Sequence, residues 1–290
     1  MARALAAIER SPDGNASLAL LDAAYRAPRA QVVGLTGPPG VGRSSLLAAM
    51  ITALRARGER LGVIAVDPSS KRSGGALLGD RVRLSTDPED PGVFVRSMAA
   101  RDRLGGLADL TLAAMVLMRA VYDHVLIETV GVGQSETDVA GVADTVLFCI
   151  QPGSGDSVQF MKAGIIEIPH IALVTKADLG APAERALADL KSALALARDG
   201  AGWEVRTLML SVRDDAAVES LIASLDSHAR YLAEADRLRR ARQAQAQTWL
   251  HEALRERFGQ EGLKRAGAVS LAPAESPFRR LAQLSQALTA

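Results

Sequence analysis

The sequence of 290 residues has few cysteines and histidines, and this scarcity excludes several classes of protein. It contains one cysteine, Cys149, which excludes a disulfide framework. Because Cys149 lies in the apolar run 146–150, we expect it to be a small core residue instead of a reactive thiol. The four histidines are scattered without ligand spacing, which argues against a stored zinc or nickel ion.

Excess charge and long apolar runs are also missing. The 34 basic and 33 acidic residues nearly balance, so there is no general electrostatic reason to bind nucleic acid or an anionic membrane. No apolar stretch approaches the roughly 20 residues that a bilayer-spanning helix needs. Residues 1–5 are interrupted by charge and do not build a long signal core. We therefore expect a cytoplasmic protein that binds neither nucleic acid nor membrane.

Short apolar segments alternate with helical segments through most of the chain, which is typical of a doubly wound α/β fold with a mostly parallel sheet. The expected strands are 31–36, 61–66, 93–97, 124–127, 145–150, 170–174 and 205–210. Helices are expected at 106–120, 182–198 and 216–229. A hydrophobic content of 48% allows one main domain with extensions at both ends.

The extensions are expected to be helical. Residues 1–28 read as an N-terminal extension of two helices joined by a turn at 11–15, and the main domain then covers 29–226. From 227 a long segment rich in Ala, Arg, Glu, Gln and Leu begins, a composition that favours helix but offers little core-forming bulk. We expect the extension 227–290 to consist of a helical arm at about 227–258 that packs on another surface and a tail at 259–290 with a last helix near 278–288.

A phosphate-binding loop follows the first expected strand. The run G-P-P-G-V-G-R-S-S fits the pattern G-x-x-x-x-G-K-[ST], with arginine in place of lysine, and consists of Gly37, Pro38, Pro39, Gly40, Val41, Gly42, Arg43, Ser44 and Ser45. Its glycines let backbone N–H groups point inward at the positive end of the next helix. The alternative is a ligand-free strand–helix turn. Arg43 keeps the charge of lysine, but its planar guanidinium cannot reproduce the compact contact of an ammonium group.

Acidic residues at other strand ends complete a candidate Mg²⁺ site. Glu128 ends an apolar strand and is followed by Gly131, whose N–H can donate to a terminal phosphate. Asp67 ends another strand, and the glycine-rich segment after it can bring Asp80 to the same edge. With the Ser44 hydroxyl these carboxylates supply oxygen ligands for Mg²⁺, which also retains several waters. The alternatives are an exposed acid for Glu128 and turn formation by Asp-Pro and Gly-Asp for the other two.

A guanine-reading segment is expected where the strand 170–174 ends in T-K-A-D. The Asp178 carboxylate can accept hydrogen bonds from the N1–H and 2-amino groups of guanine, and the Lys176 stem can cover the ring. Thr175 stands where many GTPases have asparagine, which leaves one loop-bracing hydrogen bond in question. Ser211 lies in a degenerate form of a segment that backs the base. Following a P-loop in this order, the segment favours GTP over ATP.

Several motifs together closely resemble the MeaB/ArgK-type GTPases, the G-protein chaperones of methylmalonyl-CoA mutase and related adenosylcobalamin-dependent mutases. They are V-D-P-S-S, G-G-A-L-L-G-D, E-T-V-G-V-G-Q-S-E, P-G-S-G-D and T-K-A-D, between residues 63 and 178. The resemblance implies a homodimer formed through the C-terminal arm and GTP-dependent gating of cofactor delivery to an acyl-CoA mutase. It also implies a mobile loop that couples the nucleotide site to the mutase, with Gly153, Gly155, Asp156 and Lys162.

The leading hypothesis is therefore a chaperone that binds GTP/GDP and Mg²⁺ and hydrolyses GTP slowly until its partner stimulates it. Arg43, Glu128 and Gln134, a water-positioning candidate, are the predicted catalytic residues. The sequence has no D-x-H-x-x-G cobalamin motif, so stably bound cobalamin is not expected. Two alternatives are a hydrolysis-impaired scaffold that binds the mutase and a P-loop kinase that uses ATP.

Overall fold

The fold is built on one parallel β-sheet. The computed structural model describes residues 1–68, 89–100, 109–129, 138–153, 167–196 and 202–289. Seven strands in these ranges pair in the order β3-β2-β4-β1-β5-β6-β7, and every pair is parallel. The strands are β1 Gln31–Thr36, β2 Leu61–Pro68, β3 Val93–Ala100, β4 His124–Glu128, β5 Thr145–Ile150, β6 Ile171–Thr175 and β7 Arg206–Leu210. The predicted doubly wound sheet is confirmed.

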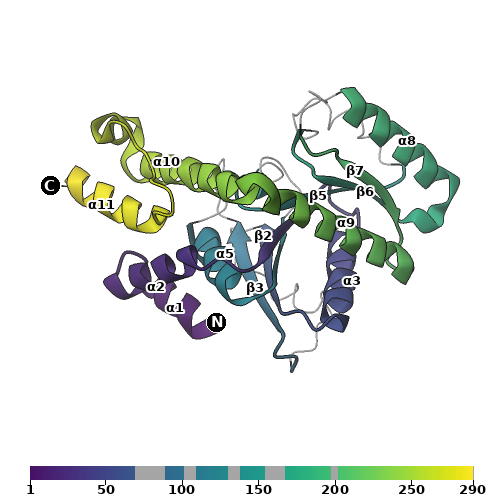
Figure 1. Cartoon of the computed structure of the whole chain (residues 1–290), viewed down its shortest axis with the longest axis horizontal. Helices are drawn as coiled ribbons and strands as arrows, with labels where there is room; N and C mark the ends of the chain where they lie inside the picture. The colour runs from purple at the N-terminus through teal and green to yellow at the C-terminus, as the bar shows by residue number, and fades with distance from the viewer. Residues whose placement is uncertain (69–88, 101–108, 130–137, 154–166, 197–201, 290) are drawn as a thin grey trace.

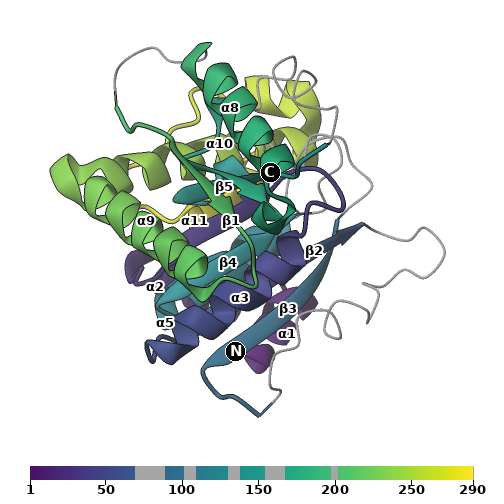
Figure 2. The same ribbon diagram turned by 90° about the vertical axis from the view of Figure 1, so that its right-hand side faces the viewer.

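Helices cover both faces of this sheet (Figure 2). The α-helices described are α1 Ala2–Arg10, α2 Asn15–Arg26, α3 Arg43–Ala56, α5 Asp109–Val121, α8 Ala181–Leu196, α9 Asp215–Ala233, α10 Arg237–Ala266 and α11 Pro277–Thr289. Short 3-10 turns are η1 Val139–Gly141, η3 Ala177–Leu179 and η4 Glu234–Asp236. Helices α3 and α9 pack on one face, while α5 and α8 cover the other and α2 packs on α5. Within the described ranges no helix is both long enough and apolar enough to cross a bilayer.

The alternation of side chains along each strand explains this layering. In β1, Val33 and Leu35 face α3 and α9, whereas Val32 faces α5. Both sets are fully buried, so the strand reads as a continuous apolar run. Cys149 in β5 is also fully buried, and burial raises the pKa of its thiol to about 12. The expected core role of this cysteine is confirmed.

The C-terminal arm is not one uninterrupted helix. Helix α9 continues to Ala233, and α10 begins only at Arg237. Between them Ala235 and Asp236 adopt left-handed backbone conformations, with φ of 48° and 59°. Neither residue is glycine, so no local pattern indicated the break. The Arg237 guanidinium donates to the Tyr231 carbonyl across it, at 2.9 Å.

The arm builds a core of its own, against the expectation that it has little core-forming bulk. Leu250 and Leu254 of α10 are fully buried, and they pack with Leu271 and Leu281. Helix α11 folds back along α10 and reaches α2, so both ends of the chain meet on one side of the sheet (Figure 1). The domain boundaries at 28/29 and 226/227 stay a prediction.

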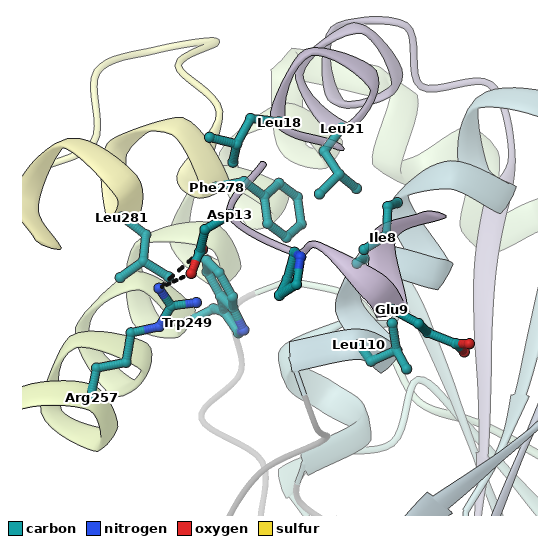
Figure 3. A pocket seen from close by; sticks show the side chains of 12 residues that line it. Ile8, Glu9, Asp13, Leu18, Leu21, Leu110, Trp249, Arg257, Phe278 and Leu281 are labelled. Atoms are coloured by element: carbon teal, nitrogen blue, oxygen red, sulfur yellow. Dashed lines mark hydrogen bonds and ion pairs between the residues drawn. The ribbon is translucent and has the colours of Figure 1, made fainter. Parts of the chain in front are cut away.

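An apolar hollow of about 340 Å³ remains where these terminal helices meet α5 (Figure 3). Trp249 and Phe278 lie on one side of it, and Leu18 and Leu21 of α2 on another. At its rim, the Arg257 guanidinium is 3.2 Å from an Asp13 carboxylate oxygen, so this ion pair ties α10 to the turn before α2.

Candidate functional site

The predicted site segments gather at one edge of the sheet because the strands are parallel. β1, β4, β5, β6 and β7 all end there, and β1 lies between β4 and β5, which the chain adds on opposite sides. In open α/β sheets, ligands bind outside the carboxyl ends of strands at such a reversal. Pairing of Leu35 with Glu128 sets the end of β4 beside the loop that follows β1.

The loop 37–45 joins β1 to α3 as expected. Gly37 has φ of +137°, and a Cβ there would lie 2.1 Å from the Cys149 carbonyl oxygen. Gly42 has φ of +91° and directly precedes Arg43, the first residue of α3. These two positions require glycine, because other residues would clash at the first and would be strained at both. The loop therefore carries the backbone of an anion nest at a helix N-terminus.

Ser44 and Glu128 meet at the centre of the site. The Ser44 hydroxyl donates a 2.7 Å hydrogen bond to the Glu128 carboxylate. Arg43 lies beside them, with its Nε 4.0 Å from the same carboxylate oxygen and its Nη1 donating to the Pro38 carbonyl at 3.1 Å. Arg43 is only 9% exposed, so its charge is held inside the loop and is not free in solvent. The arrangement places one cation and one carboxylate at the helix start.

Thr175 braces the loop although it replaces asparagine. Its Oγ1 lies 2.7 Å from the Val41 carbonyl oxygen and 2.9 Å from that of Ile150, both within hydrogen-bond distance. A hydroxyl has one proton, so it donates to one of these acceptors at a time. The side chain is buried, and β6 is thereby joined to the phosphate loop and to the end of β5. The bracing contact that the sequence left in question is therefore present.

The remaining residues of the T-K-A-D segment lie at the entrance. Lys176 has a left-handed backbone, with φ of 54°, and its Nζ donates to the Gly40 carbonyl at 3.1 Å. Asp178 is 45% exposed on its side chain. A hydrogen bond from Ser211 and the nearby Arg213 and Lys176 charges keep the Asp178 pKa below its usual value. Asp178 is thus an ionised acceptor at neutral pH, with the predicted Ser211 beside it.

Two contacts in this region were missed by the sequence reading. Lys176 Nζ also donates to the Gln151 side chain, which directly follows β5. Arg213 lies 3.9 Å from the Asp178 carboxylate. Position could have indicated both, since Gln151 stands at a strand end next to β6 and Arg213 is two residues beyond Ser211.

The remaining predicted residues are described only in part by the structure. Asp80, Gly131, Gln134, Gly155, Asp156 and Lys162 lie outside the described residues, and only the backbone of Asp67 is described, in β2. Gly153 lies in the turn after β5 with φ of +76°. Pro38, Pro39 and Ser45 belong to the loop as its sequence requires. Within the described part of the chain, no three His, Cys, Asp or Glu side chains group as metal ligands.

Comparisons with known proteins identify the family of this chain. A sequence profile described as "Methylmalonyl Co-A mutase-associated GTPase MeaB" matches residues 1–266. A Pyrococcus abyssi protein classed by name as a GTPase is 42% identical over 217 residues, 73% of this chain and 67% of its own length. The mouse methylmalonic aciduria type A homolog, a mitochondrial protein, is 37% identical over 228 residues, 77% of this chain and 55% of its own length.

Solved structures show the same fold. The crystal structure of a LAO/AO transport system kinase superposes with a TM-score of 0.67 and 27% identity, and the match covers 100% of this chain and 92% of that one. HypB from Helicobacter pylori in complex with nickel gives a TM-score of 0.55 at 17% identity, over 73% of this chain and 93% of that one, a likeness of fold alone.

Fold, phosphate loop and relatives together define a P-loop GTPase. The chain belongs to the MeaB family of methylmalonyl-CoA mutase-associated GTPases.

Proposed function

We propose that this GTPase is a chaperone that gates adenosylcobalamin loading into a cobalamin-dependent acyl-CoA mutase and protects or reactivates that enzyme. The mutase part of the proposal is supported by the family description and by the relation to the methylmalonic aciduria type A homolog. The nucleotide part is supported most directly by Asp178 and Ser211, which lie together at the entrance of a site closed by the phosphate loop. A homodimer formed through the arm and a coupling loop at 153–162 belong to the same proposal.

Guanine recognition follows from the chemistry of Asp178. An ionised carboxylate only accepts hydrogen bonds, and guanine offers two donors, N1–H and the 2-amino group, on the edge that faces it. Adenine offers no such pair. Lys176, anchored to Gly40 and Gln151, holds its apolar stem beside this position, where it can cover the face of the base.

The donor set at the loop fits Mg²⁺. Ser44 Oγ and a Glu128 carboxylate oxygen are hard oxygen ligands held 2.7 Å apart at the start of α3. Ser44, Glu128, the strand-end residue Asp67 and Asp80 would hold the ion directly or through water. The chemistry that Mg²⁺ supplies in such a site is neutralisation of charge on the terminal phosphates.

The chain's own groups would support attack of water on the γ-phosphate. Backbone N–H groups of the loop at 37 and 40–45 and the Gly131 N–H can donate to phosphate oxygens, and Arg43 adds a positive charge at the loop. Gln134 is the proposed water-positioning residue. We expect hydrolysis to be slow without the partner.

Base specificity is tested by Asp178→Asn. The amide can donate to the 2-carbonyl of xanthine but no longer accepts both guanine donors, so preference should move from GTP to XTP. Binding is measured by competition of GTP, XTP and ATP with a fluorescent GDP in the presence of Mg²⁺. Asp178→Ala is the matched control and should lose affinity for GTP without gaining affinity for XTP. Displacement by ATP as strong as by GTP in the wild type would contradict the assignment.

Turnover is tested by Arg43→Lys. A lysine ammonium makes the compact phosphate contact that a planar guanidinium cannot, so single-turnover GTP hydrolysis should become faster. Arg43→Met removes the charge and should slow hydrolysis. An unchanged or slower rate in the lysine variant would show that the arginine is not what limits this enzyme.

The partner is tested by co-purification from the native host with a non-hydrolysable GTP analogue. We expect a cobalamin-dependent acyl-CoA mutase to accompany the chain, and we expect the chain alone to carry no cobalamin. Recovery of the nucleotide-loaded chain without any such mutase would contradict the chaperone assignment while leaving the GTPase intact.

A further inference from the structure

A second cavity lies at the opposite edge of the sheet from the nucleotide site. Its volume is about 450 Å³, within the range of small-molecule sites. The walls come from α2, the end of α5, the end of α9 and the start of α10. Pro28 precedes β1 and Arg119 precedes β4, so the cavity lies at the amino ends of the strands. It is therefore separate from the site around the phosphate loop.

The polar lining of this cavity is strongly basic. Four arginines contribute, Arg26, Arg119, Arg239 and Arg242, against one acid, Asp236. Asp236 pairs with Arg239, and Arg242 pairs with Asp144, which is not one of the residues that line the cavity. The charges of Arg26 and Arg119 have no carboxylate partner among the described residues.

Arg119 is the most unusual of these side chains. It is only 4% exposed, and in the described part of the chain its guanidinium makes neither a hydrogen bond nor an ion pair. The Tyr25 ring lies 5.6 Å from the guanidinium carbon. A ring can stabilise the face of a guanidinium but leaves the in-plane N–H groups unsatisfied. Burying a charge without a hydrogen-bonding partner is costly.

The backbone holds Arg119 in this place. Its carbonyl accepts hydrogen bonds from the N–H groups of Arg29 and Ala30, both at 2.8 Å, so the end of α5 is fixed to the start of β1. Burial, and next the charge of Arg242, lower the Arg119 pKa to about 10. The group is still a cation at neutral pH, and it lines the cavity.

We propose that this cavity binds a small organic anion whose phosphate or carboxylate group is received by Arg119. The planar fork of a guanidinium matches both groups in a bidentate pair. Arg242 also lines the cavity and adds positive charge to it, although its Nε and Nη2 are engaged by Asp144 and Ala30. Leu232 and Leu238 offer an apolar wall for the carbon skeleton of the ligand.

The test uses the whole chain with its nucleotide site saturated with a non-hydrolysable GTP analogue and Mg²⁺, so that the γ-phosphate position at the loop is filled and cannot take up the probe. Inorganic phosphate, pyrophosphate and citrate are titrated separately by calorimetry. We expect saturable binding of at least one probe, with one site per chain, and the pattern among the three tells a phosphate ligand from a carboxylate ligand. Absence of saturable binding for all three would overturn the proposal.

Two variants connect binding to Arg119. Arg119→Met should weaken the Kd about ten-fold or more, as expected for loss of a charged hydrogen-bonding partner. Arg119→Lys keeps the charge without the fork and should bind with intermediate affinity, and it serves alone if the methionine variant does not fold. Arg206→Met is the control, because Arg206 also stacks on a ring, that of Trp203 at 5.4 Å, but in β7. Binding that both Arg119 variants leave unchanged would overturn the proposal.

Discussion

At the scale of single residues, two departures from the usual GTPase pattern have different structural consequences. Arg43 lies inside the loop, where it donates to the Pro38 carbonyl and its Nε is 4.0 Å from a Glu128 carboxylate oxygen. A phosphate would therefore meet a planar guanidinium instead of a compact ammonium group. Thr175 changes little, because its hydroxyl still reaches the carbonyls of the loop and of β5. In both cases, the groups that the side chain can contact predict the effect of the replacement better than its chemical similarity to the usual residue does.

Removing the Thr175 hydroxyl should weaken nucleotide binding. In Thr175→Val the buried carbonyls of Val41 and Ile150 lose their donor, which should lower the free energy of unfolding by about 1–3 kcal/mol. Affinity for GDP, measured by calorimetry, should fall as the loop loses its brace. Thr175→Ser keeps the hydroxyl and should stay near the wild type. A valine variant with unchanged stability and affinity would show that the contact does not brace the site.

At the scale of elements, α10 is fastened to the sheet by a buried ion pair. The Asp144 side chain is 1% exposed and that of Arg242 is 11% exposed, and the guanidinium makes two bonds to the carboxylate, at 2.8 and 2.6 Å. The same carboxylate accepts from the Val32 N–H at 2.8 Å, and Arg242 donates to the Ala30 carbonyl. Arm, β1 and the start of β5 therefore share one connected group of hydrogen bonds.

Breaking this pair from one side should be strongly destabilising. Arg242→Met leaves the Asp144 carboxylate buried without its cation, which should reduce the free energy of unfolding by about 3–5 kcal/mol. Arg239→Met is the matched control, since its pair with Asp236 is 65% and 61% exposed, and solvent screening leaves such a pair little effect on stability. Urea denaturation of both variants measures the difference. Equal losses in the two would contradict the assigned role of the buried pair.

The elements themselves were largely predictable from the sequence. Each expected strand forms, because strands buried on both faces are continuous apolar runs between turn residues. Parallel pairing then brought Ser44 to Glu128 and Thr175 to Val41. The break at Ala235 and Asp236 and the pair between Asp144 and Arg242 were not predictable, since they depend on tertiary contacts that leave no local pattern.

At the scale of the whole molecule, two neutral histidines make stability depend on pH. His170 and His228 lie with ring centroids 4.3 Å apart, beside Trp203 and Tyr231. Burial lowers the pKa of His170 to about 4 and that of His228 to about 3. His170 Nδ1 accepts from the Val146 N–H at 3.0 Å, a bond that needs the unprotonated nitrogen. Both side chains are therefore neutral in the folded protein at mildly acidic pH.

The unfolded chain binds protons at these histidines below their ordinary pKa of about 6.5, while the folded chain does not. Stability should therefore be full above pH 7 and fall as the pH is lowered toward 4. Between pH 7.5 and 5.5 the loss should be about 1 kcal/mol for each histidine. Urea denaturation across this range measures it, and His228→Gln should reduce the dependence on pH. A free energy of unfolding that is flat over the range would contradict the two lowered pKa values.

The contacts that fix the phosphate loop and the first strand join parts of the chain that are made at very different times. Thr175 reaches Val41 across 134 positions, and Arg242 reaches the carbonyl of Ala30 across 212. A nascent chain that has just exposed the loop at 37–45 still lacks Thr175, which contacts the loop, and Arg242, which contacts Ala30 before the first strand. Competence to hold nucleotide must then arise only after β6 has been made, so a ribosome-bound fragment that ends before Thr175 would carry the entire loop without its bracing hydrogen bond.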